Sequence, residues 1–388
     1  RGLGDVYKRQ SPSGKFAEIP LMFSRVSGIL GLYRNTAEIF LIREATPLNT
    51  PPAGRTISLP QPAYIISHAA VGGRQEGLGP LAPWFDHLCD DSFFGEKTWE
   101  KAESTMQKTA LTLALEKARL QPEDLNFVLA GDLLNQCIGT SFGLRSFRIP
   151  FFGLYGACST MGESLALGSL LVSGGFAERV GAMTSSHFCT AERQYRMPVP
   201  YGSQRTPTAQ WTATASGCCL LGAEKATLAV TAVTCGRIVD LGVTDANNMG
   251  AAMAPAAFDT LQAHFASTGT TPEDYDLVLT GDLGVLGHQI VTDLFAREGV
   301  DMGKNYLDCG MLLYDIEKQD MHAGASGCGC SASVLCGYLL RKMEEGAWKK
   351  ILFAPTGALL SPVSTSQGES IPGICHAVCI QAAETIQS

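Results

Sequence analysis

Cys158 is the residue of this chain best placed to act as a nucleophile. It follows the apolar run 149–154 and a turn at Gly156. A helical pattern opens just after it, with Thr160 and Glu163 at the spacing of a capping box. Unpaired backbone N–H groups and the helix dipole favour a thiolate at such a position. The pattern predicts a lowered pKa for the Cys158 thiol. The alternative is a small buried cysteine in a tight strand-to-helix turn.

The composition indicates a globular protein with much buried surface. Hydrophobic residues make up 45% and charged residues 17% of the 388 residues. The net charge is -8 and basic residues do not cluster, which argues against nucleic acid as a partner. The 13 cysteines are scattered through apolar segments without a secretory signal, which favours a reducing compartment. No run reaches the roughly 18 apolar residues that span a bilayer, so we expect any membrane association to be peripheral.

The first fifty residues differ in pattern from the rest of the chain. They lack periodicity, and residues 1–10 resemble adapter-derived sequence translated onto a reading frame. We expect residues 1–53 to form an extension that is either disordered or not part of the natural protein. The alternative is a short amphipathic arm at 29–42. From residue 55 the pattern is regular, with strands expected at 56–59 and 63–67.

An internal duplication organises the rest of the chain. Pro-Glu-Asp at 122–124 precedes an apolar strand at 126–133, and Pro-Glu-Asp at 272–274 precedes a similar strand at 276–283. Each copy continues with a glycine-containing elbow, a helix and a further strand. The repeat predicts two pseudo-symmetric α/β halves, at 54–240 and 241–388. Elbows at matching positions would meet, which places His322 and Cys158 in one pocket.

Eight motifs, in order along residues 55–380, give the chain a resemblance to a known family. They are Glu76–Pro80, Ala130–Gln136, Gly156–Thr160, Thr184–His187, Pro207–Thr212, Ala252–Pro255, Tyr314–Asp320 and Thr356–Pro362. The duplicated core with Cys158 and His322 is similar to the thiolase and β-ketoacyl synthase superfamily. Within that superfamily the motifs resemble the stage V sporulation protein AD family.

The resemblance implies a fold, a ligand and partners. It implies the thiolase-like αβαβα five-layered fold, a homodimer and no cofactor. It also implies a protein that supports uptake of dipicolinic acid, free or as its calcium salt, into the forespore. The expected location is the cytoplasmic side of the forespore, peripheral to the inner spore membrane. The expected partners there are other stage V sporulation membrane proteins.

The catalytic set of the superfamily is incomplete in this sequence. Cys158 supplies a nucleophile and His322 a second group, at thiolase-like positions. Where the condensing enzymes place a further histidine, at the end of the second repeat strand, this chain has Gly281 and Asp282. His288 comes later, at a spacing that departs from the pattern. We therefore expect a ligand-binding protein, and keep as the alternative an acyl-transfer enzyme acting through a Cys158 acyl-thioester.

Dipicolinate is a planar ring with two carboxylates, so it needs an apolar slot with donors at both ends. The elbow offers backbone N–H groups, and hydroxyl, imidazole, amide and guanidinium groups elsewhere add donors. The residues predicted to bind it are Cys158, Ser159, His187, Arg193, Arg196, Gln210, His322 and Ser326. No metal site is expected, because Cys328 and Cys330 have no partner pair at zinc spacing.

Overall fold

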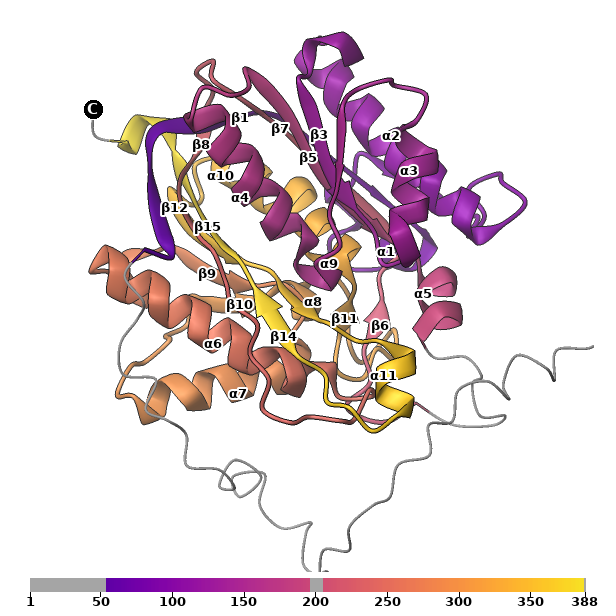
Figure 1. The fold of residues 1–388 in the computed structure, drawn as a ribbon, viewed down its shortest axis with the longest axis vertical. Helices are drawn as coiled ribbons and strands as arrows, with labels where there is room; N and C mark the ends of the chain where they lie inside the picture. The colour runs from indigo at the N-terminus through magenta and orange to yellow at the C-terminus, as the bar shows by residue number, and fades with distance from the viewer. Residues whose placement is uncertain (1–53, 196–204, 387–388) are drawn as a thin grey trace, which may run out of the picture. The chain divides into compact units, whose positions relative to one another are not determined.

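The computed structural model describes residues 54–195 and 205–386. The predicted extension, residues 1–53, lies outside the described residues. Within the described residues, an eleven-stranded mixed sheet runs through the protein in the order β10-β9-β12-β15-β8-β1-β7-β5-β3-β4, and β2 pairs with β1 (Figure 1). The strands are β1 (Thr56–Gly72), β2 (His87–Leu88), β3 (Phe127–Gly131), β4 (Phe151–Gly153), β5 (Arg179–Ser186), β7 (Ala215–Gly222), β8 (Leu228–Thr234), β9 (Leu277–Thr280), β10 (Tyr306–Asp308), β12 (Lys350–Ala354) and β15 (Ala377–Ala382).

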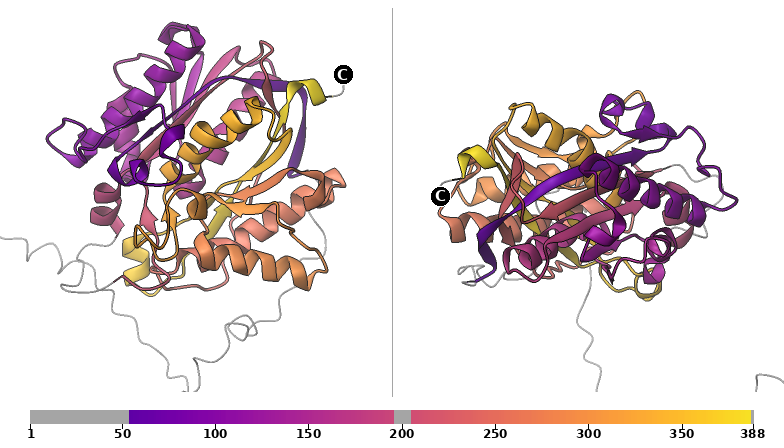
Figure 2. Two further views of the ribbon diagram at one scale, coloured as in Figure 1. Left: turned by 180° about the vertical axis from the view of Figure 1, so that it is seen from behind. Right: turned by 90° about the horizontal axis from the view of Figure 1, so that it is seen from above.

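The strand β1 joins the two sides of this sheet. Its first part pairs antiparallel with β8 and its second part with β7, and the register shifts between Ser58 and Ala63. Pro60 and Pro62 lie in that interval, and proline has no N–H to donate to a ladder. The strands expected separately at 56–59 and 63–67 are therefore one long strand with an irregularity at its prolines (Figure 2).

The sheet repeats one arrangement on its two sides. Strand β3 pairs in parallel with β4 and β5, and β9 pairs in parallel with β10 and β12. Antiparallel strands lie next on each side, β7 beside β5 and β15 beside β12. The Pro-Glu-Asp segments form matching 3₁₀ turns before β3 and β9. The predicted duplication is thus visible in the pairing, while the predicted division of the chain at residue 240 stays a prediction.

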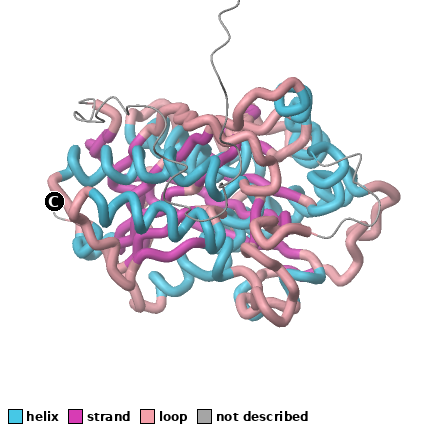
Figure 3. Tube along the Cα trace, turned by 90° about the horizontal axis from the view of Figure 1, so that it is seen from below, coloured by secondary structure: helices cyan, strands magenta, loops and turns pink. Residues whose placement is uncertain are grey.

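Helices lie outside each side of the sheet and between the two sides (Figures 1 and 3). Helices α2 and α3 cover the first side, α6 and α7 cover the second, and α4 lies between them with a helix made of α9, a π-helical segment and α10. Their bounds are α2 (Trp99–Ala118), α3 (Ile138–Leu144), α4 (Thr160–Ser173), α6 (Met249–Thr268), α7 (Gly284–Arg297), α9 (Cys328–Ser333), the π segment (Val334–Leu339) and α10 (Leu340–Glu344). The five-layered thiolase-like fold is confirmed.

Shorter elements complete the described chain. They are the helices α1 (Arg74–Gly77), α5 (Phe188–Tyr195), α8 (Cys309–Leu312) and α11 (Pro362–Ser366), and the strand pairs β6 (Trp211–Thr212) with β11 (Ala325–Ser326) and β13 (Thr356–Ala358) with β14 (Gly373–Cys375). The segments β11, β13 and α5 carry residues that line the cavity beside Cys158. No described helix combines the length and the apolar character that a membrane crossing requires.

Buried apolar side chains form three main clusters that match the layers. The largest lies between the two sides of the sheet and includes Met161 and Leu165 of α4 and Leu335 and Leu339 of the π segment. A second cluster packs α6 on the second side, and a third packs α2 on the first. Burial of such side chains stabilises by about 1.5–3 kcal/mol each relative to exposure, so the central helices are fixed mainly by packing.

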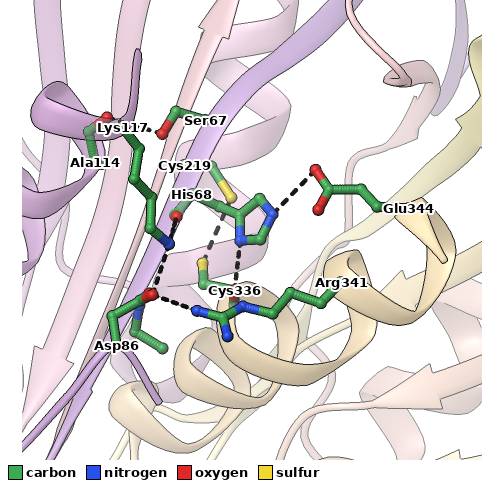
Figure 4. A network of polar contacts seen from close by, with 10 residues as sticks. Ser67, His68, Asp86, Ala114, Lys117, Cys219, Cys336, Arg341 and Glu344 are labelled. Atoms are coloured by element: carbon green, nitrogen blue, oxygen red, sulfur yellow. Dashed lines mark hydrogen bonds and ion pairs between the residues drawn. The ribbon is translucent and has the colours of Figure 1, made fainter. Parts of the chain in front are cut away.

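A polar network ties the end of the central helix to β1 and α2 (Figure 4). The Lys117 ammonium lies 2.7 Å from an Asp86 carboxylate oxygen and donates to the His68 carbonyl at 2.7 Å. Arg341 of α10 pairs with the same Asp86 carboxylate. The His68 ring lies 3.3 Å from the Glu344 carboxylate. The last turn of α10 is thereby held against the first side of the sheet, while the other end of the central helix, at α9, reaches the candidate site.

Candidate functional site

Cys158 lies in a 3₁₀ turn, Ala157–Ser159, that leads directly into α4. The turn is tight, because Ala157 has φ +51° and a side chain on Gly357 of β13 would come within 2.5 Å of the Gly156 carbonyl oxygen. The predicted elbow is therefore present.

The capping box predicted at this elbow is wrong. Ser159 is the N-cap of α4 and makes no side-chain capping bond. Thr160 donates its hydroxyl to the Ala157 carbonyl at 2.7 Å instead of accepting from the helix. The Glu163 Oε2 atom is buried without a partner among the described residues. The 3₁₀ turn satisfies one of the backbone groups concerned, because the Thr160 N–H donates to the Ala157 carbonyl.

The Cys158 thiol lies close enough to the carboxyl group of Asp282, which comes just after β9, for each group to act on the pKa of the other. Asp282 is completely buried. It accepts hydrogen bonds from the Ser326 hydroxyl at 3.1 Å, the Gly327 N–H at 2.9 Å and the Thr356 hydroxyl at 3.1 Å. One carboxyl group thus connects the elbow of the first half with three segments of the second half.

The thiol of Cys158 is not activated in this setting. Burial raises its pKa well above the ordinary value, and the nearby Asp282 carboxylate and the Cys328 thiol raise it further. The predicted lowering of this pKa by the helix end is wrong, because burial and the acidic neighbour outweigh the dipole. Burial also raises the pKa of Asp282, to about 7. Near neutral pH the site therefore holds a neutral thiol beside a buried carboxyl group.

His322 does not meet Cys158. Its backbone is left-handed, with φ +52°, and its ring lies 2.7 Å from the Thr206 carbonyl oxygen and 3.2 Å from the Asp320 carboxylate. The second-half residue that packs with Cys158 is Cys328, at the start of α9. The matched elbows do approach each other, but the residue at the matched position lies six places beyond His322 in the chain.

A cavity of about 280 Å³ opens beside Cys158. Its walls are mostly apolar, with hydroxyl groups at a few points. It is lined by Leu133, Tyr155, Ala157, Cys158, Ala191, Glu192, Tyr195, Thr212, Met249, Ser326, Ala358, Leu359, Leu360 and Ser361. Among these described residues Glu192 is the one charged side chain, and no histidine is present. An apolar slot with a few hydroxyl groups suits a small, largely flat ligand.

Of the residues predicted to bind a ligand, the cavity brings together Cys158 and Ser326. Gln210 lies behind them, where its amide donates to the backbone carbonyls of Asp282 at 2.6 Å and Ala325 at 2.8 Å. Ser159 is fully buried and donates its hydroxyl to a carbonyl within its own turn. Gln210 and Ser159 are therefore positioned to hold the site's backbone in place.

The predicted cationic and imidazole groups lie elsewhere. His187 is buried and its ring lies 2.8 Å from the Ser92 carbonyl oxygen. Arg193 of α5 pairs with Glu100 and stacks over the Trp99 ring, away from the lining residues. Arg196 lies outside the described residues.

Several lining residues were missed by the sequence reasoning. Tyr155 and Tyr195 approach each other with their hydroxyls 3.2 Å apart, and Tyr195 donates to the Leu133 carbonyl. Ala358–Ser361 form one edge of the cavity. The family motif at 356–362 was the available signal for that edge, since a glycine, small residues and no charge are typical of a segment packed against a site. Met249, which begins α6, carried no such signal.

The thiols and acids near the cavity are not arranged as metal ligands. In the part of the chain that the structure describes, no group of three or more His, Cys, Asp or Glu side chains is placed to hold a metal ion. Cys330 directs its thiol to the Gly281 carbonyl oxygen at 3.7 Å.

Comparison with solved structures defines the class of protein. The chain is similar to 3-oxoacyl-[acyl-carrier-protein] synthase III of Aquifex aeolicus, with a TM-score of 0.52 at 13% identity over 82% of this chain and 99% of that chain. It is similar to human mitochondrial 3-ketoacyl-CoA thiolase, with a TM-score of 0.53 at 12% identity over 85% of this chain and 100% of that chain. It is also similar to a variant of Xanthomonas campestris OleA, with a TM-score of 0.54 at 14% identity over 83% of this chain and 98% of that chain. At these identities the likeness shows a thiolase-like fold.

The particular family is defined by the sequence. The family model for stage V sporulation protein AD matches residues 53–381. Stage V sporulation protein AD of Bacillus subtilis (strain 168) is 42% identical over 322 residues, covering 83% of this chain and 95% of that protein. The chain belongs to the stage V sporulation protein AD family.

The raised pKa of Cys158 predicts slow alkylation. A thiol with a raised pKa carries less thiolate at pH 7 than an ordinary cysteine, and a buried one is also less accessible to the reagent. We expect iodoacetamide to modify Cys158 at least about tenfold more slowly than Cys89, which is partly exposed. The rates are measured on the two peptides by mass spectrometry. Equal rates would show that the thiol is activated after all.

Proposed function

We propose that this chain is a dipicolinate-binding protein that supports dipicolinate uptake into the forespore, using the cavity beside Cys158. The observation that carries the proposal is the buried Asp282 carboxyl against the Cys158 thiol. The cavity beside Cys158 remains open, but the activated thiol that acyl transfer in the thiolase superfamily requires is absent. Membership of a sporulation family supports the biological setting.

The chemical argument concerns both partners of the thiol. Claisen condensation or thiolysis needs a thiolate and donors for the thioester oxyanion. Cys158 is held as a neutral thiol. Asp282 accepts three hydrogen bonds, so its carboxyl group cannot act as the donor that a thioester oxyanion needs. Loss of one preorganised oxyanion donor costs on the order of 3 to 4 kcal/mol of transition-state stabilisation. The cavity is therefore suited to bind a ligand without catalysing acyl transfer.

The lining of the cavity fits the parts of dipicolinate. The ring would pack between apolar walls such as Leu133 and Leu360, and the carboxylates would accept from the hydroxyls of Ser361 and Thr212.

Filling the cavity should abolish binding. In isothermal titration with dipicolinate, alone and as its calcium salt, we expect saturable binding to the unaltered protein and none to Cys158→Leu, because the larger side chain occupies the slot. Cys89→Leu, outside the lining, should bind like the parent. Circular dichroism checks that both variants are folded. A folded Cys158→Leu variant with parental affinity would place the ligand elsewhere.

The solved structures with this fold are named as synthases and a thiolase, so acyl transfer through Cys158 is the second candidate. We expect no thiolase or ketoacyl synthase turnover above background with short acyl-coenzyme A substrates, because no activated thiol is available. Product formation is followed by mass spectrometry, with Cys158→Ala as the matched blank. Steady turnover that disappears in Cys158→Ala would replace the binding function by the enzymatic one.

We further propose that the chain works at the cytoplasmic side of the forespore, peripheral to the inner spore membrane, with other stage V sporulation membrane proteins. Membership of the stage V sporulation protein AD family supports this setting. Copurification from sporulating cells under mild detergent would identify those partners.

We propose that two copies of the chain pair through β4. This strand ends the sheet order and has β3 as its partner among the described strands. Phe151 and Phe152 on it are 39% and 51% exposed, and Phe142 of the adjoining α3 is 48% exposed. An apolar, unpaired strand edge is a template for pairing with a second copy.

A charge on this edge should separate the copies. We expect light scattering after gel filtration to give a dimer mass for the parent and a monomer mass for Phe152→Glu. Phe176→Glu changes a more exposed phenylalanine away from β4, and should stay dimeric. A monomeric parent, or a dimeric Phe152→Glu, would contradict pairing through β4.

A further inference from the structure

We propose that Glu103 and Asp132, two buried carboxyl groups beside the cavity, hold one proton between them, and that this proton keeps the α5 wall of the cavity in place. The pair acts on the cavity itself, whichever ligand enters it.

The two side chains are close neighbours in the interior. Both are completely buried, Glu103 on α2 and Asp132 just after β3. A side-chain carbon on Gly139 would lie 3.3 Å from the Asp132 Oδ2 atom and 3.4 Å from the Glu103 Cγ atom, so both groups flank the same glycine. Two ionised carboxylates this close in a dry interior would repel strongly.

The hydrogen bonds of Asp132 identify it as the ionised partner. Its Oδ1 atom accepts from the Leu134 N–H at 2.8 Å. Its Oδ2 atom accepts from the Thr140 N–H at 2.7 Å and the Thr140 hydroxyl at 2.6 Å. Both oxygens are occupied by donors, three in all, and such a carboxyl group has no acceptor for a proton of its own to reach.

The hydrogen bonds of Glu103 identify it as the protonated partner. Its Oε1 atom accepts from the Ser185 hydroxyl at 2.9 Å. Its Oε2 atom lies 2.8 Å from the Thr190 hydroxyl oxygen, which also lies 2.9 Å from the His187 carbonyl oxygen. The single Thr190 proton cannot serve both oxygens. If Thr190 donates to the His187 carbonyl, a proton on Glu103 Oε2 can donate to the Thr190 hydroxyl oxygen, and every close contact is then a hydrogen bond.

The surroundings supply negative or neutral groups to this pair. Facing it are Gln107 of α2, which bonds the Thr140 and Ser185 hydroxyls, and the Cys328 thiol of α9, whose raised pKa reflects burial and both carboxyls. Arg193 of α5 is engaged with Glu100. Across the ranges 54–195 and 205–386, no ion pair joins either carboxyl group to a basic side chain. Burial, followed by the charge of Asp132, raises the pKa of Glu103 to about 8.

The pair holds two walls of the cavity. Thr190 is in the first turn of α5, and Ala191 and Tyr195 of the same helix line the cavity. Asp132 anchors the turn that carries Leu133, another lining residue. Loss of the proton would force Thr190 to donate to Glu103, break its bond to the first-turn carbonyl and set two carboxylates against each other. The wall α5 would then loosen.

The sign of the pH effect is set by proton linkage. Glu103 holds its proton up to about pH 8 in the closed wall, whereas an exposed glutamate releases it near 4.5. The closed state therefore binds more protons, and its stability falls as pH rises from about 4.5 through 8. Between pH 6 and pH 9 this raises the opening of α5 by on the order of a hundredfold, an increase that a chain unable to lose the proton does not show.

Glu103→Gln tests the idea, because an amide reproduces the neutral acid: its oxygen accepts from Ser185 and its NH₂ group donates to Thr190. Hydrogen exchange of the peptide 188–195 is compared at equal pH by mass spectrometry. We expect the ratio of the parent rate to the variant rate to rise by on the order of a hundredfold from pH 6 to pH 9. Glu116→Gln, an exposed change on the same helix, should behave like the parent.

Asp132→Asn, unlike Glu103→Gln, is expected to destabilise the protein. Its amide would have to direct an NH₂ group toward an N–H donor of Leu134 or Thr140, so we expect a lower melting temperature than the parent at every pH from 6 to 9. The proposal is overturned if Glu103→Gln fails to fold, if its exchange tracks the parent at pH 9, or if Asp132→Asn is tolerated as well as Glu103→Gln.

Discussion

The interaction on which the site depends is the one between the Cys158 thiol and the buried Asp282 carboxyl. Asp282 is held by β11, by the N-terminus of α9 and by β13, so it fixes the second-half segments against the elbow of the first half. The same contact sets the chemistry of the pocket, because a carboxyl beside a buried thiol opposes its ionisation. Position and reactivity are determined together by one side chain.

The duplicated fold has given its two Gly-Asp pairs different surroundings. Gly131-Asp132 lies at the end of β3 and Gly281-Asp282 at the end of β9, at matching places in the sheet. Asp132 accepts from backbone and side-chain groups of the turn and helix that come after it, whereas Asp282 reaches across to segments more than 40 residues away. Asp132 anchors the turn that carries the lining residue Leu133, and Asp282 accepts from Ser326, which also lines the cavity.

Much of the fold could be predicted from the sequence, and less of the site. The repeat of Pro-Glu-Asp and an apolar strand predicted the duplicated sheet because both signals are local and periodic. The approach of Cys158 and Ser326 was a consequence of the repeat. The positions of His322 and Arg193 could not be predicted from the repeat. Each side chain pairs with a nearby acid, Asp320 or Glu100, and the spacing of residues in the sequence does not reveal that pairing. The pKa of Cys158 depended on a burial and a neighbour that only tertiary structure supplies.

Five buried acids of the described chain have a common thermodynamic consequence. Burial raises the pKa of Glu76, Glu103, Asp132, Asp282 and Asp308, and each of these residues is at most 1% exposed. A carboxyl whose pKa is raised on folding binds its proton more tightly in the native state, so its contribution to stability is greatest in mild acid and decreases as pH rises through the folded pKa. Hydroxyls and backbone N–H groups, rather than cations, satisfy these acids. These five acids therefore oppose folding as pH rises, whereas His264 and His376, whose pKa values burial lowers to about 4, oppose folding as pH falls.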